Sequence, residues 1–163
     1  MKLGLFGHPV SHSRSPRLFA RLSRLLKRPI SYALVEVHAG GLGAAVAVAR
    51  DAGWRGANVT VPLKEEAAAL ADWLTPEARA LGAVNVLRFG RTVVGHNTDG
   101  EGLRDALRRA GVAARGRDAL VFGGGGAARA AGWALGKEGA RAVRFTARTT
   151  ERAKKTAKDL GRC

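Results

Sequence analysis

A short segment near the N-terminus carries hydroxyl groups at the point where a strand should give way to a helix. Ser13 and Ser15 lie within residues 7–16, and Ser15 directly precedes Pro16 at the predicted start of the helix. Hydroxyls beside the free N–H groups of a helix N-terminus could hold a carboxylate. The same residues could serve as an ordinary turn and helix N-cap. This segment alone therefore favours neither interpretation.

Two further segments carry amide, ammonium and carboxylate groups at the ends of predicted strands. Asn58 and Thr60 alternate on one side of a strand, and Lys64 follows soon after it. Asn85 and Asp99 follow in the next segment, although the Asn-Thr-Asp-Gly run that contains Asp99 would by itself indicate a turn. Three such segments within a hundred residues favour one shared pocket.

A glycine run in the second half has the composition of a phosphate-binding turn. It follows an apolar strand and leads into a helix. Its residues are Gly123, Gly124, Gly125, Gly126, Ala127 and Ala128. Glycine lets the backbone turn tightly and approach a pyrophosphate, while the helix N-terminus offers N–H groups. Four glycines can also form a structurally silent loop, but the order strand, turn, helix favours a dinucleotide cofactor.

Arginines after the next predicted strand indicate which dinucleotide is bound. Arg148 lies roughly 20 residues after the glycine turn, where NAD-binding proteins place an acidic residue on the ribose 2′-hydroxyl. Thr149 and Arg152 follow, and paired guanidinium groups suit the 2′-phosphate of NADP. The alternative is a basic helix start that continues with Lys154. The pattern predicts NADP rather than NAD.

These residues depend on elements that alternate between short apolar and longer amphipathic runs, which is typical of an α/β fold with a mainly parallel sheet. The predicted strands are 2–6, 30–35, 56–60, 84–89, 92–95, 119–122 and 142–146. The predicted helices are 16–27, 40–52, 63–73, 76–81, 100–110, 126–137 and 150–160. Ser15 and Thr75, each followed by proline, mark two helix starts. A division near residues 97–102 predicts domains at 1–100 and 101–163.

The composition indicates a folded protein and excludes several classes. Apolar residues make up 46% and charged residues 25%, as in ordinary globular proteins. No apolar run approaches the roughly 20 residues of a membrane span, so we expect no membrane association and a cytoplasmic location. Cys163 is the single cysteine and the histidines are scattered, so we expect no metal site. The sequence predicts no particular oligomeric state.

A net charge of +15 permits binding to nucleic acid. The sharpest basic cluster is a helical stripe beside Leu18, Leu22 and Leu25, made of Arg17, Arg21, Arg24 and Arg28. No aromatic stacking platform accompanies the stripe. We therefore expect a solvated helix face and no nucleic-acid partner.

Taken together, these segments resemble the shikimate dehydrogenase family. The resemblance rests, in chain order, on Ser13-x-Ser15-Pro16, Asn58-Val-Thr60-x-Pro62-x-Lys64, Gly82-Ala-Val-Asn85, Asn97-Thr-Asp99-Gly100, the glycine turn, and Arg148-Thr149-x-x-Arg152. It implies an N-terminal substrate domain followed by a truncated Rossmann-like NADP-binding domain. The implied activity is the reversible, NADP-dependent reduction of 3-dehydroshikimate to shikimate, on the route to chorismate and the aromatic amino acids.

The resemblance also implies roles for individual residues. Ser13 and Ser15 would hold the substrate carboxylate, and Lys64 and Asp99 would form the catalytic pair. The groups that would contact the ring hydroxyls are Asn58, Thr60, Asn85 and Asp99. A quinate/shikimate dehydrogenase and a catalytically silent shikimate-binding module remain as alternatives.

The sequence departs from the family pattern at several positions. Phe19-Ala20 stands where the family usually has His-Asn, Val86 replaces a usual threonine, and Ala147 replaces a common asparagine. The loss of that asparagine predicts weaker binding of NADP. Family members continue well beyond this length, so we expect an incomplete cofactor domain.

Overall fold

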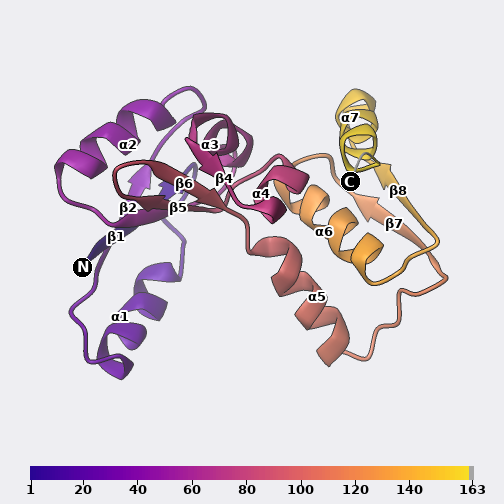
Figure 1. Cartoon of the computed structure of the whole chain (residues 1–163), viewed down its shortest axis with the longest axis horizontal. Coiled ribbons are helices and arrows are strands. Elements are labelled where there is room, and N and C mark those ends of the chain that lie inside the picture. The colour runs from indigo at the N-terminus through magenta and orange to yellow at the C-terminus, as the bar shows by residue number, and fades with distance from the viewer. Residues whose placement is uncertain (162–163) are drawn as a thin grey trace. The chain divides into compact units, whose positions relative to one another are not determined.

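The computed structural model describes residues 1–161, and the chain folds into two compact α/β units (Figure 1). The first unit comprises Met1–Thr75 and Val84–His96, and the second comprises Pro76–Ala83 and the chain from Asn97 onward. Residues 76–83 thus belong to the second unit, although the predicted boundary placed them before the division. Their helix packs against two helices of the second unit.

The first unit is built on a six-stranded sheet within the described residues. Its strands are β1 (Lys2–Gly7), β2 (Ser31–Glu36), β3 (Gly56–Val59), β4 (Trp73–Leu74), β5 (Val86–Phe89) and β6 (Val93–His96). Their order is β2-β1-β3-β5-β6-β4. β1 pairs in parallel with both β2 and β3, whereas β5 runs antiparallel to β3 and β6. The predicted α/β class with a mainly parallel sheet is confirmed.

The helices of the first unit are α1 (Ser15–Leu25), α2 (Leu42–Asp51) and α3 (Lys64–Leu70). The core lies around Phe6, Leu42, Leu63 and Leu87, which are almost completely buried. The ring of Phe6 stacks on Trp54 with centroids 5.8 Å apart. Burial of such side chains from distant segments stabilises the sheet and fixes the ends of β1 and β3 relative to each other.

The second unit contains the parallel strands β7 (Asp118–Phe122) and β8 (Ala142–Thr146). Its helices are α4 (Pro76–Leu81), α5 (Asp99–Arg109), α6 (Gly126–Lys137) and α7 (Thr150–Leu160). α6 packs on both strands and α7 packs on β8. Arg129 of α6 is 3% exposed, and its guanidinium pairs with Asp159 of α7 at 2.8 Å and donates to the Leu81 carbonyl at the end of α4. This buried contact joins three helices.

The element predictions agree with the structure apart from small shifts and two errors. The strand β4 was missed because it has only two residues and lies where helix 63–73 was predicted to end. The predicted N-cap role of Ser15 is wrong: Ser15 is already helical, Arg14 occupies the N-cap position, and no side chain caps the helix. Among the described helices, none combines the length and apolar content needed to cross a membrane.

Candidate functional site

The loop between β1 and α1, residues 8–14, is held in place by the Glu36 carboxylate at the end of β2. Glu36 accepts hydrogen bonds from the N–H groups of Val10 at 2.9 Å and Ser11 at 3.2 Å, and its other oxygen lies 2.9 Å from His8 Nδ1. These contacts, led by the Val10 N–H, lower the pKa of Glu36 below its ordinary value. The ionised carboxylate therefore anchors the loop that carries the first two predicted site residues.

Ser13 and Ser15 lie in one polar group with a residue from β2. The Ser13 hydroxyl donates to Ser15 Oγ at 3.1 Å, and the Ser15 N–H donates back to Ser13 Oγ at 3.2 Å. The hydroxyl of Tyr32, a residue of β2, donates to Asn58 Oδ1 at 2.8 Å, and the Ser15 side chain lies near enough to this phenol to influence its pKa. Burial raises the pKa of Tyr32. Ser15 is the first residue of α1, one position past the N-cap, and its hydroxyl accepts a hydrogen bond from the Ser13 hydroxyl.

Backbone hydrogen bonds bring the second and third polar segments to the same end of the sheet. The carbonyl of Asn85 accepts the N–H of Val59 at 2.9 Å and lies 3.5 Å from Asn58 Nδ2. The carbonyl of Lys64, the first residue of α3, accepts the N–H of Val84 at 2.8 Å. Thr60 follows β3 and bonds the Phe6 carbonyl through its N–H at 2.9 Å.

All six predicted substrate residues of the first unit are half-buried. They are Ser13, Ser15, Asn58, Thr60, Lys64 and Asn85. They lie at or near the carboxyl ends of the parallel strands β1 and β3, where ligands of open α/β sheets usually bind. Half-burial keeps such groups fixed in position while they remain open to a ligand. The structure thus assembles a polar site from three separate segments of the sequence.

Asp99, the seventh predicted residue, begins α5 of the second unit. Its N–H donates to Asn97 Oδ1 at 2.9 Å, and Asn97 Nδ2 donates to the Ala83 carbonyl at 2.9 Å. Asn97 is 1% exposed, so its amide holds the start of α5 from inside the unit. The pairing of Asp99 with Lys64 remains a prediction.

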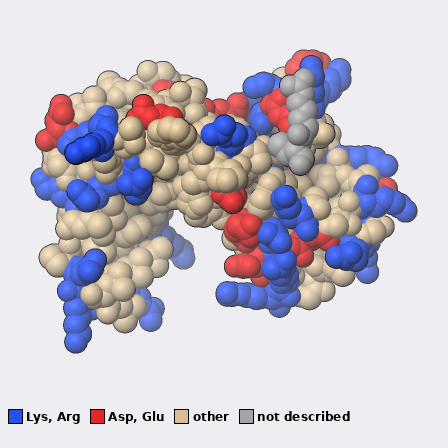
Figure 2. Space-filling view, in the orientation of Figure 1, with Lys and Arg blue, Asp and Glu red and all other residues tan. Residues whose placement is uncertain are grey.

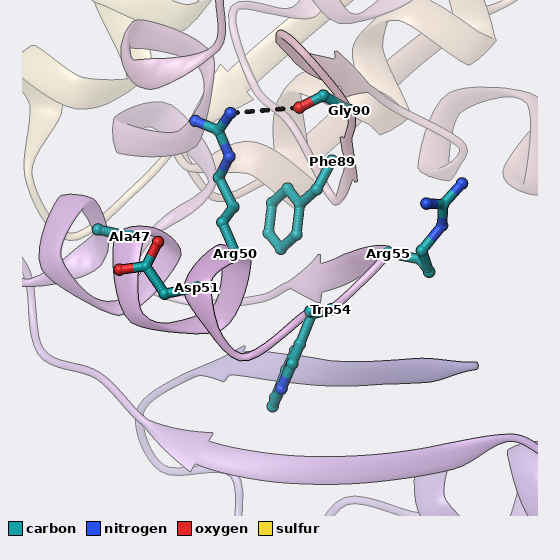
Figure 3. A pocket seen from close by; sticks show the side chains of 8 residues that line it. Ala47, Arg50, Asp51, Trp54, Arg55, Phe89 and Gly90 are labelled. Carbon is teal, nitrogen blue, oxygen red and sulfur yellow. Dashed lines mark hydrogen bonds between the residues drawn. The ribbon is translucent and has the colours of Figure 1, made fainter.

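A hollow of about 610 Å³ lies elsewhere on the first unit, and none of the predicted site residues line it (Figure 3). It lies where α2 ends and β3 begins, and its lining includes Arg50, Trp54 and Arg55. Arg50 donates to the carbonyls of Gly90 and Arg91, both at 3.2 Å. Arg50 therefore ties α2 to the turn between β5 and β6.

The glycine turn of the second unit has the tight geometry that its sequence predicts. Gly123 has φ +136°, a region that side chains rarely adopt, and its N–H donates to the Thr146 carbonyl at 2.7 Å. A Cβ on Gly124 would lie 2.9 Å from the carbonyl carbon of Arg152. Ala128 is buried at the start of α6. β7, α6 and α7 thus meet at a turn where a side chain on Gly124 would not fit.

The predicted arginines share a hollow of about 470 Å³ with this turn. The hollow is lined by Phe122, Gly123, Gly124, Thr146, Ala147, Arg148, Thr149 and Arg152. Arg148, Thr149 and Arg152 are exposed. The Thr156 hydroxyl of α7 donates to the Gly124 carbonyl at 3.0 Å, and this hydrogen bond ties the turn to α7. Backbone N–H groups and two guanidinium groups around one hollow suit a phosphorylated ligand.

The remaining residues of the glycine turn lie outside the lining of this hollow. Gly125 is the N-cap of α6, Gly126 begins the helix and Ala127 is exposed. No other group lies within 4 Å of a Cβ built on Gly125, so the N-terminus of α6 is open. Its first N–H groups can therefore be reached by a ligand.

Arg17, Arg21 and Arg24 are exposed on α1, but the helix ends at Leu25, so Arg28 lies beyond it and the predicted helical stripe contains three of the four arginines. Figure 2 shows Lys and Arg gathered on α1, with no acidic side chains on that helix. Leu18 and Leu25 beside the stripe are 56% and 68% exposed. Within residues 1–161 none of the four arginines forms an ion pair, which agrees with a solvated face.

Three positioning residues were missed from the sequence: Tyr32, Glu36 and Asn97. Tyr32 and Glu36 lie within strand β2, and nothing in their spacing distinguishes them from ordinary strand residues. The sequence pattern included Asn97 in the Asn-Thr-Asp-Gly run but gave it no role of its own. Its burial and its two hydrogen bonds give it a structural role beside Asp99.

A mainly parallel sheet in the first unit and a strand, glycine turn and helix in the second define a Rossmann-like α/β protein. The family model described as the shikimate dehydrogenase substrate binding domain matches residues 5–87. The chain belongs to the shikimate dehydrogenase family.

Curated proteins and solved structures that are similar to this chain belong to the same family. A shikimate dehydrogenase (NADP(+)) of Symbiobacterium thermophilum is 40% identical over 161 residues, which cover 98% of this chain and 55% of that protein. A Thermus thermophilus shikimate 5-dehydrogenase, solved in complex with NADP(H) and shikimate, superimposes with a TM-score of 0.87 at 36% identity. It is matched over 99% of this chain and 61% of its own.

The shikimate dehydrogenase of Aquifex aeolicus gives a TM-score of 0.91 at 36% identity, over 99% of this chain and 60% of its own. The chain therefore spans between half and two thirds of the length of these relatives.

Proposed function

We propose that the chain forms the substrate-binding unit and a cofactor-binding unit of an NADP-dependent shikimate dehydrogenase, which interconverts 3-dehydroshikimate and shikimate on the route to aromatic amino acids. The observation that carries the proposal is the polar group at the end of the parallel strands, in which Ser13 hydrogen-bonds Ser15 and the nearby Tyr32 hydroxyl hydrogen-bonds Asn58. The Thermus thermophilus relative that was solved with NADP(H) and shikimate supports the same ligands.

The polar groups of the first unit match the chemistry of shikimate. Its carboxylate would accept hydrogen bonds from Ser13 and Ser15, which lie at the N-terminus of α1. Its ring hydroxyls would bond to the remaining predicted residues, Asn58, Thr60, Asn85 and Asp99. A site built to bond hydroxyl groups rejects molecules that lack them, because its own polar groups are then left without partners.

Lys64 would provide the acid and base function. Reduction of a ketone to a secondary alcohol requires a proton at oxygen, and oxidation of the alcohol requires its removal. The Lys64 ammonium would donate that proton in one direction, and the neutral amine would take it back in the other. The carboxylate of Asp99 would orient the ammonium group.

The residues of the second unit fit NADP. Gly124 packs closely against Arg152, whereas nothing lies within 4 Å of a Cβ built on Gly125, so the turn is tight and is open to a pyrophosphate at the N-terminus of α6. Gly123 and Gly124 would approach the phosphates, with the N-terminus of α6 beyond them. Arg148, Thr149 and Arg152 would bind the ribose 2′-phosphate. Bound NADP would supply or accept the hydride.

The test combines the purified chain with shikimate and NADP and follows the absorbance of NADPH. We expect its formation, and calorimetry should detect binding of each ligand added alone. Binding of shikimate without NADP would favour the catalytically silent binding module. Equal rates with quinate would favour a quinate/shikimate dehydrogenase. Binding of neither ligand would contradict the proposal.

A further inference from the structure

Tyr32 occupies the centre of the polar site although no residue pattern in the sequence singles it out. Its ring stacks on Phe19 of α1, with centroids 4.2 Å apart and planes 16° from parallel. The ring is half-buried, and burial raises the pKa of its hydroxyl. Packing against Phe19 fixes the ring, so the phenol oxygen is held at a defined point between α1 and β3.

The hydrogen bond of this hydroxyl determines how the side chain of Asn58 faces. Tyr32 donates to Asn58 Oδ1 at 2.8 Å, which engages the carbonyl end of the amide. The NH₂ end then lies on the other side, where it is 3.5 Å from the Asn85 carbonyl. An asparagine amide accepts at one end and donates at the other. Asn58 therefore presents donor groups away from Tyr32.

On its other side, Tyr32 lies near the two serines. Ser13 donates to Ser15 Oγ; burial raises the pKa of the phenol, and the nearby Ser15 side chain acts in the opposite direction. Ser15 would turn its proton toward a bound carboxylate. The Tyr32 proton would still be directed at Asn58, because that bond uses the phenol's own hydrogen. The orientation of Asn58 is thus separable from the binding of a carboxylate.

We propose that Tyr32 is a positioning residue that holds the Asn58 amide in its donor orientation, so that the pocket favours an acid with a ring hydroxyl at that point. The inference rests on the proposed function, which assigns Asn58 to a ring hydroxyl. Tyr32 acts through Asn58 and need not touch the ligand. Phe19 supports the role by fixing the ring.

The test compares two probes by calorimetry: shikimate, and cyclohexene carboxylate, which has the carboxylate but no ring hydroxyls. Tyr32→Phe keeps the ring and removes the hydroxyl. We expect this variant to bind shikimate roughly threefold to tenfold more weakly, as for one lost hydrogen bond, and to bind cyclohexene carboxylate as the unaltered chain does. Equal weakening for both probes, or for neither, would overturn the proposal.

A double-mutant cycle tests whether Tyr32 acts through Asn58. In an Asn58→Ala background, Tyr32→Phe should cause no further loss of shikimate binding. A full additional loss would show that Tyr32 contacts the ligand directly or supports the pocket by another route. Thermal unfolding of each variant confirms that the fold is retained.

A measurement without ligand separates this inference from the proposed function. Tyr32→Phe should shift the side-chain NH₂ signals of Asn58 in the NMR spectrum of the free chain, because the amide loses its fixed partner. Unchanged Asn58 signals would overturn the positioning role, even in a chain that binds shikimate. Failure of the unaltered chain to bind shikimate would instead overturn the proposed function and the ligand preference that depends on it.

Discussion

Lys64 begins α3, and its carbonyl is bonded to Val84, so the root of its side chain is fixed beside the loop that carries Asn85. Lys64→Ala should lower turnover of shikimate and NADP by about 100-fold or more, since proton transfer by a positioned side chain typically contributes that much. The rate of NADPH formation measures the effect. Thermal unfolding should be little changed, because Lys64 is only half-buried.

Lys158 of α7 provides a matched control because it is an exposed lysine on a helix outside both predicted sites. Lys158→Ala should retain full turnover. Unchanged turnover in Lys64→Ala would remove Lys64 from the mechanism.

Arg148 is predicted to decide between the two dinucleotides. Arg148→Gln should weaken NADP binding about tenfold or more, since hydrogen bonds to charged groups contribute roughly 1.5–3 kcal/mol. NAD, which lacks the 2′-phosphate, should bind as before. Calorimetric titration with each nucleotide measures the difference.

The control for this experiment is Arg144→Gln. Arg144 is exposed on β8 and pairs with Asp118 at 2.8 Å, and it does not line the hollow. Its replacement should alter the affinity for neither nucleotide. A parallel loss of NAD and NADP binding in Arg148→Gln would contradict the assignment to the 2′-phosphate.

At the scale of elements, the glycine turn depends on the close approach of α7. A Cβ on Gly124 would lie 2.9 Å from both the carbonyl carbon and the Cβ of Arg152. Gly124→Ala should therefore displace the start of α7, weaken NADP binding and destabilise the second unit. Calorimetry and urea unfolding measure the two effects.

Gly136, near the end of α6, is the matched control, because a Cβ there would have no other atoms within 4 Å. Gly136→Ala should leave NADP binding unchanged and raise the stability by about 0.5–1 kcal/mol, as alanine does within a helix. Equal NADP affinity in the Gly124 and Gly136 variants would refute the importance of the close approach.

The stability of the loop 8–14 should depend on pH, because the Glu36 carboxylate that anchors it can be protonated. Its folded pKa lies below the ordinary value of 4.5, so its contacts stabilise the loop above that pH. They are lost as the pH falls through the lower folded value. Protection of the Val10 and Ser11 amides against hydrogen exchange should therefore decrease as the pH falls from 4.5 through the lower folded pKa.

Glu36→Gln removes the titrating group. In this variant, protection of the two amides should be weaker at neutral pH and nearly independent of pH. If the unaltered loop stayed equally protected down to its acid unfolding, Glu36 would not be its anchor.

At the scale of the whole molecule, the alternation of apolar runs was sufficient to predict the order of most elements. Polar residues at predicted strand ends, such as Asn58 and Lys64, could also be chosen as site residues because strand ends of a parallel sheet meet at one edge. Tyr32 and Glu36 could not, because tyrosine is common in strands and the partners of Glu36 are backbone groups of a distant loop.

The sequence also could not predict which of the two units contains α4. Thr75-Pro76 marks its start, but whether a short helix joins the preceding or the following unit depends on packing against α6 and α7, which come more than forty residues later. Local pattern predicts that a helix exists. Long-range burial decides where it belongs.

The path of the backbone through the two units has a practical consequence. The chain passes from one unit to the other after Thr75, Ala83 and His96, so no single cut yields two intact pieces. A fragment ending at residue 96 would contain α4 but not α6 and α7. The apolar side of α4 that packs on those two helices would then be exposed to solvent. Dissection would instead require a redesigned connection between Thr75 and Val84, with α4 supplied to the other piece.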